Sequence, residues 1–332
     1  MSQASNAPYP FEDIPPEFLG FQQRLNQADA AVRRIAIMDI ADEEDSELLP
    51  LLHHALLHDS AVVVRKEAAI RLEGWEDAQS ISSLSKALLD SNTEVKQAAA
   101  QSLSELKQAD SAAPLLPLLQ HDDHYVRAAA LRAIRVLRPL AALDVVIENT
   151  RHADVLVRRE AVSTLGWLKQ QSAQALLAQL ASSDPDAEVR RIATGALGIS
   201  TVNDPAVEQA LLQALNDDIW QIRVEAALTI GKVKVAAAIQ PLINALQDSY
   251  WQVRIPAARA LGKLKAVVAV DALAEPLQHE ISNLRKEAAL ALGEIGGPQA
   301  LQLLQQAEQD NDPEVRKAVR IALGQIQQVG QI

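Results

Sequence analysis

The chain has 332 residues, of which 48% are hydrophobic and only 3% aromatic, and it carries a formal net charge of -12. Apolar content made mostly of Ala, Leu, Val and Ile favours thin, closely packed helices over one thick core. The absence of cysteine excludes disulfides, thiolate metal sites and a cysteine nucleophile. The acidic balance argues against a protein that coats nucleic acid or an anionic membrane.

The first twenty residues differ from the rest of the chain. They contain no basic stretch followed by an apolar core, and no run of 18 apolar residues occurs elsewhere, so we expect no signal peptide or membrane span and a cytoplasmic location. The stretch "NAPYPFEDIPPEFLG" is acidic and rich in proline, which excludes a regular helix. We expect residues 1–20 to cap the first repeat, since terminal repeats need a cover. The alternative is that these residues form a flexible acidic peptide that a partner recognises and binds.

A repeated pattern occupies residues 21–328. Its basic residue, usually within a "VR" pair, recurs at intervals of 31 to 33 residues. The ten positions are Arg33, Arg65, Lys96, Arg127, Arg158, Arg190, Arg223, Arg254, Arg285 and Arg316. A fixed period of this length is typical of repeat architectures.

Within each repeat the apolar residues follow helical spacing. Around Arg254 they are Val253, Ala257, Leu261 and Leu264, which share one face of a helix. A second Leu-rich helical run, such as "AAAIQPLINALQD", precedes each of these helices. One such hairpin cannot bury its apolar face alone, so we predict an all-α fold, an α-solenoid (superhelix) of about ten helical hairpins of about 31 residues.

The turn inside each hairpin is marked by acidic residues. Four residues before the Arg, helix N-caps are predicted at Asp29, Asn92, Asp123, Asp154, Asp186 and Asp312. Six residues before it a second Asp recurs, and this Asp and the Arg can pair along the stack. The resulting structural set comprises Asp59, Arg65, Asp90, Arg127, Arg158, Asp184, Arg190, Asp217, Arg223, Asp248, Arg254, Arg285, Asp310 and Arg316.

Histidine replaces the second Asp in three repeats, at His121, His152 and His279. We expect these side chains to form hydrogen bonds within the turn. The alternative is a pH-dependent contact, because His titrates near neutrality.

Helical geometry also identifies the face opposite the apolar stripe. Three of the four tryptophans lie on this face, and Trp75 falls on the core stripe. The face combines aromatic and charged side chains, which is typical of binding hot spots, although any single aromatic could instead pack against its neighbours. The candidate partner-binding residues are His124, Tyr125, Arg132, Arg159, Glu160, Trp167, Arg191, Trp220, Gln221, Glu225, Lys232, Trp251, Gln252, Arg259 and Lys263.

The combination of an Asp turn, "VR", an "AAxALG"-like stretch and a second Leu-rich helix resembles the short HEAT-like repeats of the phycobilisome-lyase type. The resemblance covers residues 21–328 and implies one continuous solenoid. It further implies that the VR helix lines the concave surface, with its outward positions contacting ligands. Such repeats serve many unrelated functions, so the resemblance defines architecture better than activity.

Catalytic and metal-binding chemistry finds little support. The motif "HHALLH" places His54 and His58 one turn apart, but no third ligand is evident, so we expect surface histidines. No nucleophile motif or phosphate-binding loop occurs. We therefore expect no catalytic residue, metal or cofactor.

The leading functional prediction is a non-catalytic scaffold or assembly factor that holds a client protein or peptide on its concave face. The first alternative is a lyase-type chaperone that handles a tetrapyrrole or another cofactor. The second is a nucleic-acid-binding protein that uses Arg132, Arg159, Arg191, Lys232, Arg259 and Lys263. The acids interleaved with these bases count against the second alternative.

Overall fold

The computed structural model describes residues 9–10, 12, 15–200 and 204–329, and within these ranges it contains helices and turns without any β-strand. The chain divides into two compact units, Met1–Leu168 (unit 1) and Lys169–Ile332 (unit 2). Each described part is a stack of helical hairpins, so the predicted all-α solenoid fold is confirmed. That residues 21–328 form a single continuous domain stays a prediction.

Unit 1 contains five hairpins. They are α1 and α2 (Gly20–Leu25, Ala30–Asp42), α3 and α4 (Leu49–His58, Val62–Arg71), α5 and α6 (Ala78–Ala87, Thr93–Ser104), η3 and α7 (Ala109–Gln120, His124–Leu137), and α8 and α9 (Leu143–Asn149, Val155–Leu168). Short 3-10 segments are η1 (Pro16–Phe18), η2 (Ser46–Leu48) and η4 (Leu140–Ala142).

Unit 2 repeats the arrangement. Its hairpins are α10 and α11 (Gln174–Ser183, Ala187–Ala196), α12 and α13 (Pro205–Ala214, Trp220–Val233), α14 and α15 (Ile239–Ala245, Trp251–Lys263), η8–η10 and α16 (Val267–Ala269, Asp271–Leu273, Pro276–Gln278, Ser282–Ile295), and α17 and α18 (Pro298–Gln306, Pro313–Val329). The remaining 3-10 segments are η5 (Gln171–Ala173), η6 (Leu197–Ile199) and η7 (Ala236–Ala238).

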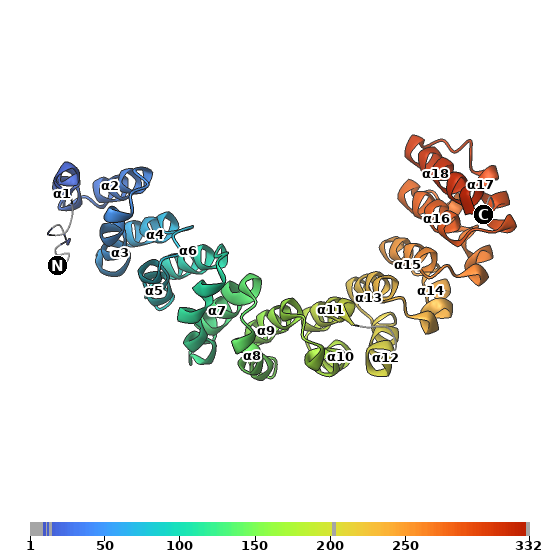
Figure 1. Cartoon of the computed structure of the whole chain (residues 1–332), viewed down its shortest axis with the longest axis horizontal. Coiled ribbons are helices and arrows are strands. Elements are labelled where there is room, and N and C mark those ends of the chain that lie inside the picture. Colours follow the sequence, from blue (N-terminus) through green and yellow to red (C-terminus); the bar gives the residue numbers. More distant parts are fainter. Residues whose placement is uncertain (1–8, 11, 13–14, 201–203, 330–332) are drawn as a thin grey trace. The chain divides into compact units, whose positions relative to one another are not determined.

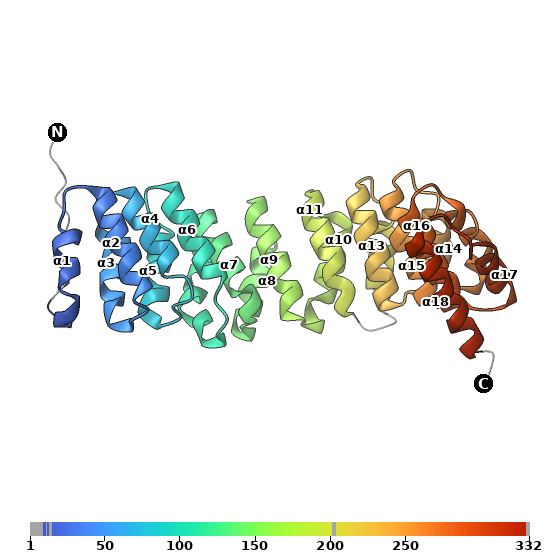
Figure 2. The same cartoon turned by 90° about the horizontal axis from the view of Figure 1, so that it is seen from above.

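The second helix of each hairpin, which carries the repeated Arg or Lys, is called the VR helix below. The VR helices of a unit lie side by side in one layer, and the helices that precede them form the other layer (Figures 1 and 2). In unit 2 the VR helices line the inner side of the bend. The apolar stripe points between the layers, where Val253, Ala257 and Leu261 are fully buried.

The predicted N-caps are confirmed. The side chains of all six residues accept hydrogen bonds from backbone N–H groups two or three residues later, as Asp312 does from Glu314 and Val315. These hydrogen bonds satisfy backbone N–H groups that otherwise have no partner at the start of a helix. They place the start of each of these VR helices at a fixed distance from its Arg or Lys.

Two of the expected Leu-rich helices are 3-10 helices instead of α-helices. Segment η3 is a 3-10 helix that contains Pro114 and Pro117, and the corresponding run in unit 2 breaks into η8, η9 and η10, with Pro276 opening the last. Proline has no N–H to donate and its ring clashes with the preceding turn, so a regular α-helix is disfavoured at these points.

The expectation that Trp75 belongs to the core stripe is wrong. Helix α4 ends at Arg71, and Gly74 adopts a left-handed conformation with φ of 86°. Trp75 therefore lies in the following turn, half-buried, beside a hollow that is also lined by Asp42, Glu44 and Glu73. Glycine enters this conformation without the steric cost of a Cβ, which explains why the helix stops before Trp75.

Glycines let neighbouring VR helices of unit 2 approach closely. A Cβ added to Gly262 would lie 2.8 Å from Ala291 Cα, and one added to Gly293 would lie 2.6 Å from both Ala322 Cα and Cβ. No real Cβ tolerates such distances, so these helices pack backbone against small side chain. The same register holds Gly324 in α18, where a Cβ would meet no atom within 4 Å.

We predict that Gly293→Ala destabilises unit 2 by about 1–3 kcal/mol, because the added methyl forces α16 and α18 apart. Gly324→Ala is the matched control. It should instead raise stability by up to about 1 kcal/mol, since alanine favours the helix interior. Chemical denaturation followed by circular dichroism measures both. Equal effects of the two substitutions would show that close helix approach is not the controlling factor.

A buried histidine links the second and third hairpins of unit 1. His53 is 8% exposed, and its Nε2 lies 2.8 Å from Ser80 Oγ, which joins α3 to α5. Burial lowers the pKa of the His53 imidazole, an effect that nearby Asp77 opposes. The folded chain therefore favours neutral His53.

Acidification should destabilise unit 1 through His53. The unfolded chain binds a proton at this residue near pH 6.5 while the folded chain does not, so stability falls as the pH drops below about 6.5. Carboxylates with lowered pKa lose their contribution only at lower pH. We predict that the melting temperature of His53→Gln changes less between pH 7.5 and 5.5 than that of the wild type. An unchanged pH dependence would exclude His53 as the source.

Candidate functional site

A ladder of ion pairs joins successive hairpins along the turns. In each pair the guanidinium Nε of one hairpin lies 2.7–2.9 Å from Oδ2 of the Asp in the next. The pairs are Arg33–Asp59, Arg65–Asp90, Arg190–Asp217, Arg223–Asp248 and Arg285–Asp310. Each is bidentate, because Nη2 also donates to Oδ1. Hydrogen bonds from Arg285 lower the pKa of the Asp310 carboxyl, which burial opposes.

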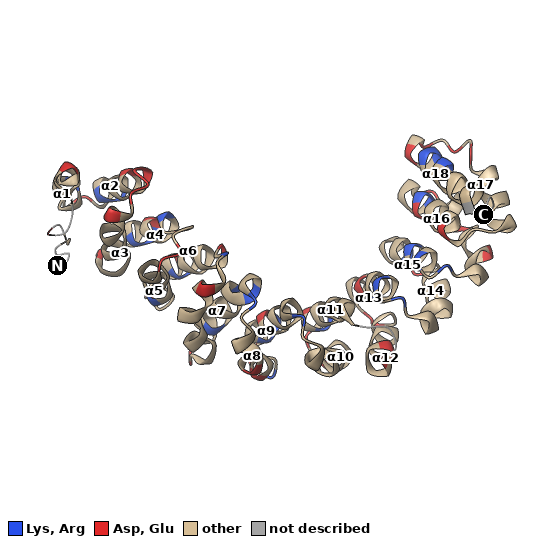
Figure 3. Cartoon of the chain, in the orientation of Figure 1, with Lys and Arg blue, Asp and Glu red and all other residues tan. Residues whose placement is uncertain are grey.

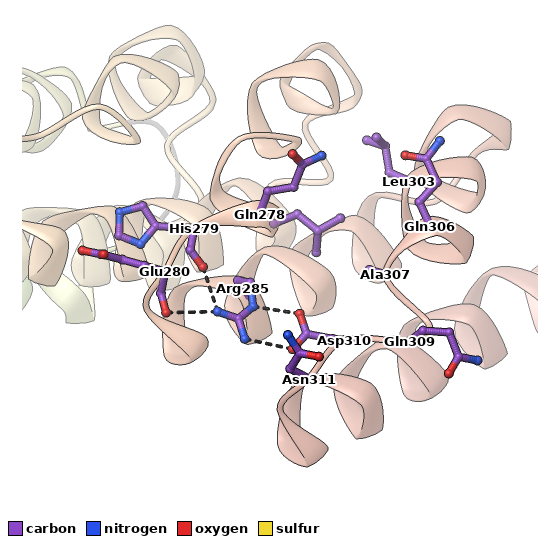
Figure 4. Close-up of a pocket in the computed structure, with 11 residues that line it drawn as sticks. Gln278, His279, Glu280, Arg285, Leu303, Gln306, Ala307, Gln309, Asp310 and Asn311 are labelled. Atoms are coloured by element: carbon purple, nitrogen blue, oxygen red, sulfur yellow. Dashed lines mark hydrogen bonds and ion pairs between the residues drawn. The ribbon is translucent and has the colours of Figure 1, made fainter.

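The same arginines also hold their own turns. Arg285 Nη1 donates to the carbonyl oxygens of His279 and Glu280 at 2.8 and 3.1 Å, as Figure 4 shows. The ladder Asp in turn accepts an N–H two residues later, so that Asp310 Oδ1 receives Asp312 N at 2.8 Å. One Arg and one Asp therefore fix both the turn and the stacking register.

The rest of the predicted structural set forms other contacts. Arg127 donates to His121 O and Asn149, Arg158 to His152 O, Arg254 to Asp248 O and Arg316 to Asp310 O, while Asp184 accepts from Asp186 N. Arg254 also lies 3.9 Å from Glu275, and Lys96 lies 3.8 Å from Asp123.

The expected turn hydrogen bonds of His121, His152 and His279 are confirmed. In each, Nδ1 accepts the backbone N–H two residues later at 3.0–3.1 Å, as the Asp carboxylate does elsewhere. A nitrogen that accepts a hydrogen bond carries no proton, so the imidazole reproduces the turn contact of Asp but not its negative charge.

We predict that Asp90→Ala costs about 3–5 kcal/mol, because it leaves the largely buried Arg65 guanidinium without its partner. The double variant Arg65→Met/Asp90→Leu should recover most of this loss, since no charge is then left unpaired. Urea denaturation checks both proteins. A double variant that is as unstable as Asp90→Ala would point to the lost turn hydrogen bond of Asp90 with Asn92 instead.

Charged residues on the candidate face of unit 1 form ion pairs with one another. Arg132 donates to Glu160 at 2.9 Å, and Arg135 lies 3.6 Å from the same carboxylate. Glu160 is only 8% exposed, so little of this candidate contact residue is accessible to a partner. Two arginines from the neighbouring helix α7 cover it. Arg159, also on α9, is half-exposed.

Aromatic side chains of unit 1 flank this cluster. Trp167 is 41% exposed, and the guanidinium carbon of Arg138 lies 5.1 Å from the centroid of its ring, a cation–π contact. His124 is exposed at the first position of α7, and Tyr125 beside it is half-buried, which raises the pKa of its hydroxyl. The face thus keeps Trp167 and His124 accessible.

Unit 2 presents a second aromatic group at the start of two VR helices. Trp220 and Tyr250 stack with ring centroids 5.7 Å apart and planes inclined by 14°. The guanidinium of Arg223 lies 5.8 Å from the Tyr250 ring, and Trp251 is 39% exposed. Gln221 is exposed beside this group and Gln252 is half-exposed. Sequence reasoning missed Tyr250, which occupies the position of an N-cap Asp, although two aromatics in "SYW" were a signal.

The charges of the unit 2 face are largely paired with one another. Arg259 donates to both oxygens of Glu287 at 3.0 and 2.7 Å. Arg191 binds Glu188 at 2.6 Å and lies 3.5 Å from Glu225, whose pKa is raised by burial despite this arginine. Lys232 and Lys263 are exposed, and within the described part of the chain neither forms an ion pair within 4.0 Å. Figure 3 shows both signs of charge on the VR helices.

Other site classes find no geometric support in residues 9–10, 12, 15–200 and 204–329. No three His, Cys, Asp or Glu residues of these ranges come together as metal ligands. The His54 and His58 rings lie 4.9 Å apart, but His54 also contacts the Tyr9 ring at 4.6 Å. No helix among them is long and apolar enough to cross a membrane. The cytoplasmic location stays a prediction.

The stacked hairpins, capped turns and ion-pair ladder define a helical repeat protein. The family model described as HEAT repeats matches residues 19–104, 52–135, 112–198, 175–262, 207–280 and 239–324, so the chain belongs to the HEAT repeat family. The search of curated proteins gives no match.

Solved structures of low sequence identity share the fold. An engineered protein is 22% identical, with a TM-score of 0.54 and coverage of 93% of this chain and 98% of its own. Kap95p is 14% identical with a TM-score of 0.65, and importin beta is 15% identical with a TM-score of 0.60. The alignments cover 94% and 92% of this chain but only 50% of each of theirs, so the chain spans about half their length.

Proposed function

We propose that this protein is a non-catalytic scaffold that holds a client protein or an extended peptide against its VR helices. The observation that carries the proposal is the exposure of two tryptophans on these helices. Trp167 lies under the guanidinium of Arg138, and Trp251 directly follows Tyr250, whose ring stacks on Trp220. Large rigid aromatics beside arginine supply most of the binding energy in protein interfaces. A repeat fold supports such contacts over a long surface.

The charge pattern favours a protein over a nucleic acid as the partner. Arg132, Arg191 and Arg259 are each bound to glutamates of the same face. A phosphate backbone would have to compete with these carboxylates for every one of the three arginines. Mixed charge of both signs suits a polypeptide surface better.

The structural relatives are compatible with this proposal. Binding of Kap95p induces the switch loops of RanGDP to adopt the GTP-bound conformation, so Kap95p binds another protein. The likeness to our chain extends to the fold alone. A more specific assignment, the phycobilisome-lyase repeat type with a role as a chaperone that handles a tetrapyrrole or another cofactor, stays a prediction. An absorbance spectrum of the purified protein tests whether a tetrapyrrole is bound.

Substitution of the exposed side chains tests the proposal. We predict that Trp167→Ala/Trp251→Ala/Arg259→Ala weakens client binding about tenfold or more, because these residues offer the accessible aromatic and cationic contacts. The client is first identified by affinity capture from native lysate and mass spectrometry, and binding of the purified client is then measured by calorimetry.

The matched control is Lys86→Ala/Gln179→Ala/Gln302→Ala, three exposed positions on α5, α10 and α17 in the opposite layer. It should bind the client as the wild type does, and both triple variants should keep their helical circular dichroism. Equal loss in both variants, or no loss in either, would place the client elsewhere and refute the VR-helix surface.

A further inference from the structure

The first rung of the ladder differs from the others because the N-terminal segment lies on it. The Tyr9 hydroxyl donates to Asp59 Oδ2 at 3.0 Å, and its ring contacts His54. Tyr9 is itself only 7% exposed. A tyrosine from outside the repeats therefore occupies the surface of the Arg33–Asp59 pair.

The exposure of the ion pairs shows the effect of this tyrosine. The Arg33 and Asp59 side chains are 4% and 0% exposed. The corresponding values are 13% and 11% for Arg223–Asp248 and 14% and 11% for Arg285–Asp310. These two rungs have the same bidentate geometry but stay more exposed than the first. At Asp248 the Tyr250 ring lies 5.8 Å from the Arg223 guanidinium, and no described tyrosine donates to either carboxylate as Tyr9 does to Asp59.

The hydrogen bonds accepted by the ladder carboxylates also distinguish the first rung from the other two. Asp59 Oδ2 accepts from both Arg33 Nε and the Tyr9 hydroxyl. Oδ2 of Asp248 and of Asp310 accepts only from its arginine Nε among the described donors. A carboxylate oxygen accepts two hydrogen bonds, so each of these atoms keeps one position for a further donor.

A hollow lies over each of these two rungs, both within unit 2. The hollow at Asp248 has a volume of about 440 Å³ and the one at Asp310 about 390 Å³ (Figure 4), sizes within the range of ligand pockets. Both are built from the same repeat positions. At Asp248 these are Leu215, Asn216, Asn244 and Ala245. At Asp310 they are Leu277, Gln278, Gln306 and Ala307.

At the first rung the corresponding positions hold Leu25, Asn26, Ala55 and Leu56. Leucine and alanine at these positions supply the smaller, apolar part of a mostly polar lining, and the ladder carboxylate supplies a charged acceptor. Tyrosine suits this combination because its ring is apolar and its hydroxyl donates.

We propose that the hollows at Arg223–Asp248 and Arg285–Asp310 are sockets for tyrosine side chains of an extended segment in a partner protein. Tyr9, with proline on both sides in the sequence, is the chain's own example of the contact. In each socket the tyrosine hydroxyl donates to Oδ2 of the ladder Asp. At Asp248 the ring also meets Tyr250, which lines the hollow.

Acidic residues at the edge of each hollow indicate which tyrosine-containing segments it would prefer. Asp218 borders one hollow and Glu280 the other, at the same repeat position. These acids favour a lysine or arginine near the tyrosine and disfavour phosphotyrosine, whose negative charge would face the ladder carboxylate. The preferred segment is therefore basic and unphosphorylated.

The distance between the sockets sets the spacing of two tyrosines. The sockets are two hairpins apart, and packed helices are separated by about 8–10 Å, so they lie about 20 Å apart. An extended chain advances about 3.3 Å per residue, so tyrosines about six residues apart reach both sockets. The sockets lie at the turn edge of the stack and include neither Trp167 nor Trp251, although Tyr250 lines one socket and stacks on Trp220 of the candidate face.

The test uses a fluorescent synthetic peptide of residues 2–20 of this chain with Glu12→Lys, Asp13→Lys and Glu17→Lys, which make the segment basic, and the full-length protein as the receptor. Anisotropy titration should show saturable binding. The affinity of the peptide with Tyr9→Phe should be lower by about tenfold or more, because this peptide lacks the hydrogen bond to a charged acceptor. The phosphotyrosine peptide should not bind measurably. Equal binding of the tyrosine and phenylalanine peptides would overturn the proposal.

Blocking variants locate the binding. Ala245→Trp/Ala307→Trp fills both hollows while leaving the ladder residues in place, and should abolish binding of the tyrosine peptide. Ala237→Trp, at an exposed position in η7 that lines neither hollow, is the control and should bind normally. Circular dichroism and the single variants check folding. Retained binding by a folded double variant would refute the sockets.

The Trp167→Ala/Trp251→Ala/Arg259→Ala variant separates this inference from the proposed function. Its three residues line neither hollow. It should bind the peptide as the wild type does even when it has lost the client. Loss of the peptide in this variant would assign the peptide to the VR-helix surface and overturn the sockets.

Discussion

The guanidinium–carboxylate pair between successive hairpins is the interaction on which most of this architecture depends. Its arginine binds the carbonyls of its own turn, and its aspartate accepts an N–H that closes the turn of the next hairpin. Because both side chains are largely shielded from water, each needs the other. The pair therefore couples the shape of a turn to the position of the next hairpin, and the apolar stripes meet in register.

With the core and the turns fixed in this way, side chains on the outer surfaces are available for recognition. Trp167 on the VR helices of unit 1 and Trp251 on those of unit 2 are exposed, while the turn edge of unit 2 carries two polar hollows. Glycines at Gly262 and Gly293 bring neighbouring VR helices close together, so side chains from adjacent hairpins lie within reach of one partner segment. Repetition thus provides both stability and a regular spacing of contacts.

The sequence predicted the hairpins and their caps because both depend on local spacing. Val253, Ala257 and Leu261 share a helix face whatever their neighbours are, and Asp312 caps the helix that it precedes. Contacts between hairpins were harder to predict. The burial of Glu160 depends on two arginines of another helix, and the position of Trp75 depends on where Gly74 ends α4. The contact between Tyr9 and Asp59 joins residues far apart in sequence, which no periodicity indicates.

The three histidine substitutions give the stack an uneven mechanical character. Where His121, His152 and His279 replace Asp, the turn keeps its hydrogen bond but the carboxylate that would pair with the preceding hairpin is gone. Lys96 and Arg254 reach only looser contacts, at 3.8 and 3.9 Å. The junctions at Lys96 and Arg254 lack a bidentate ion pair, so apolar packing, which is less directional, contributes a larger share of their stability. Under a pulling force, neighbouring hairpins at these junctions would separate before hairpins that are joined by a bidentate ion pair.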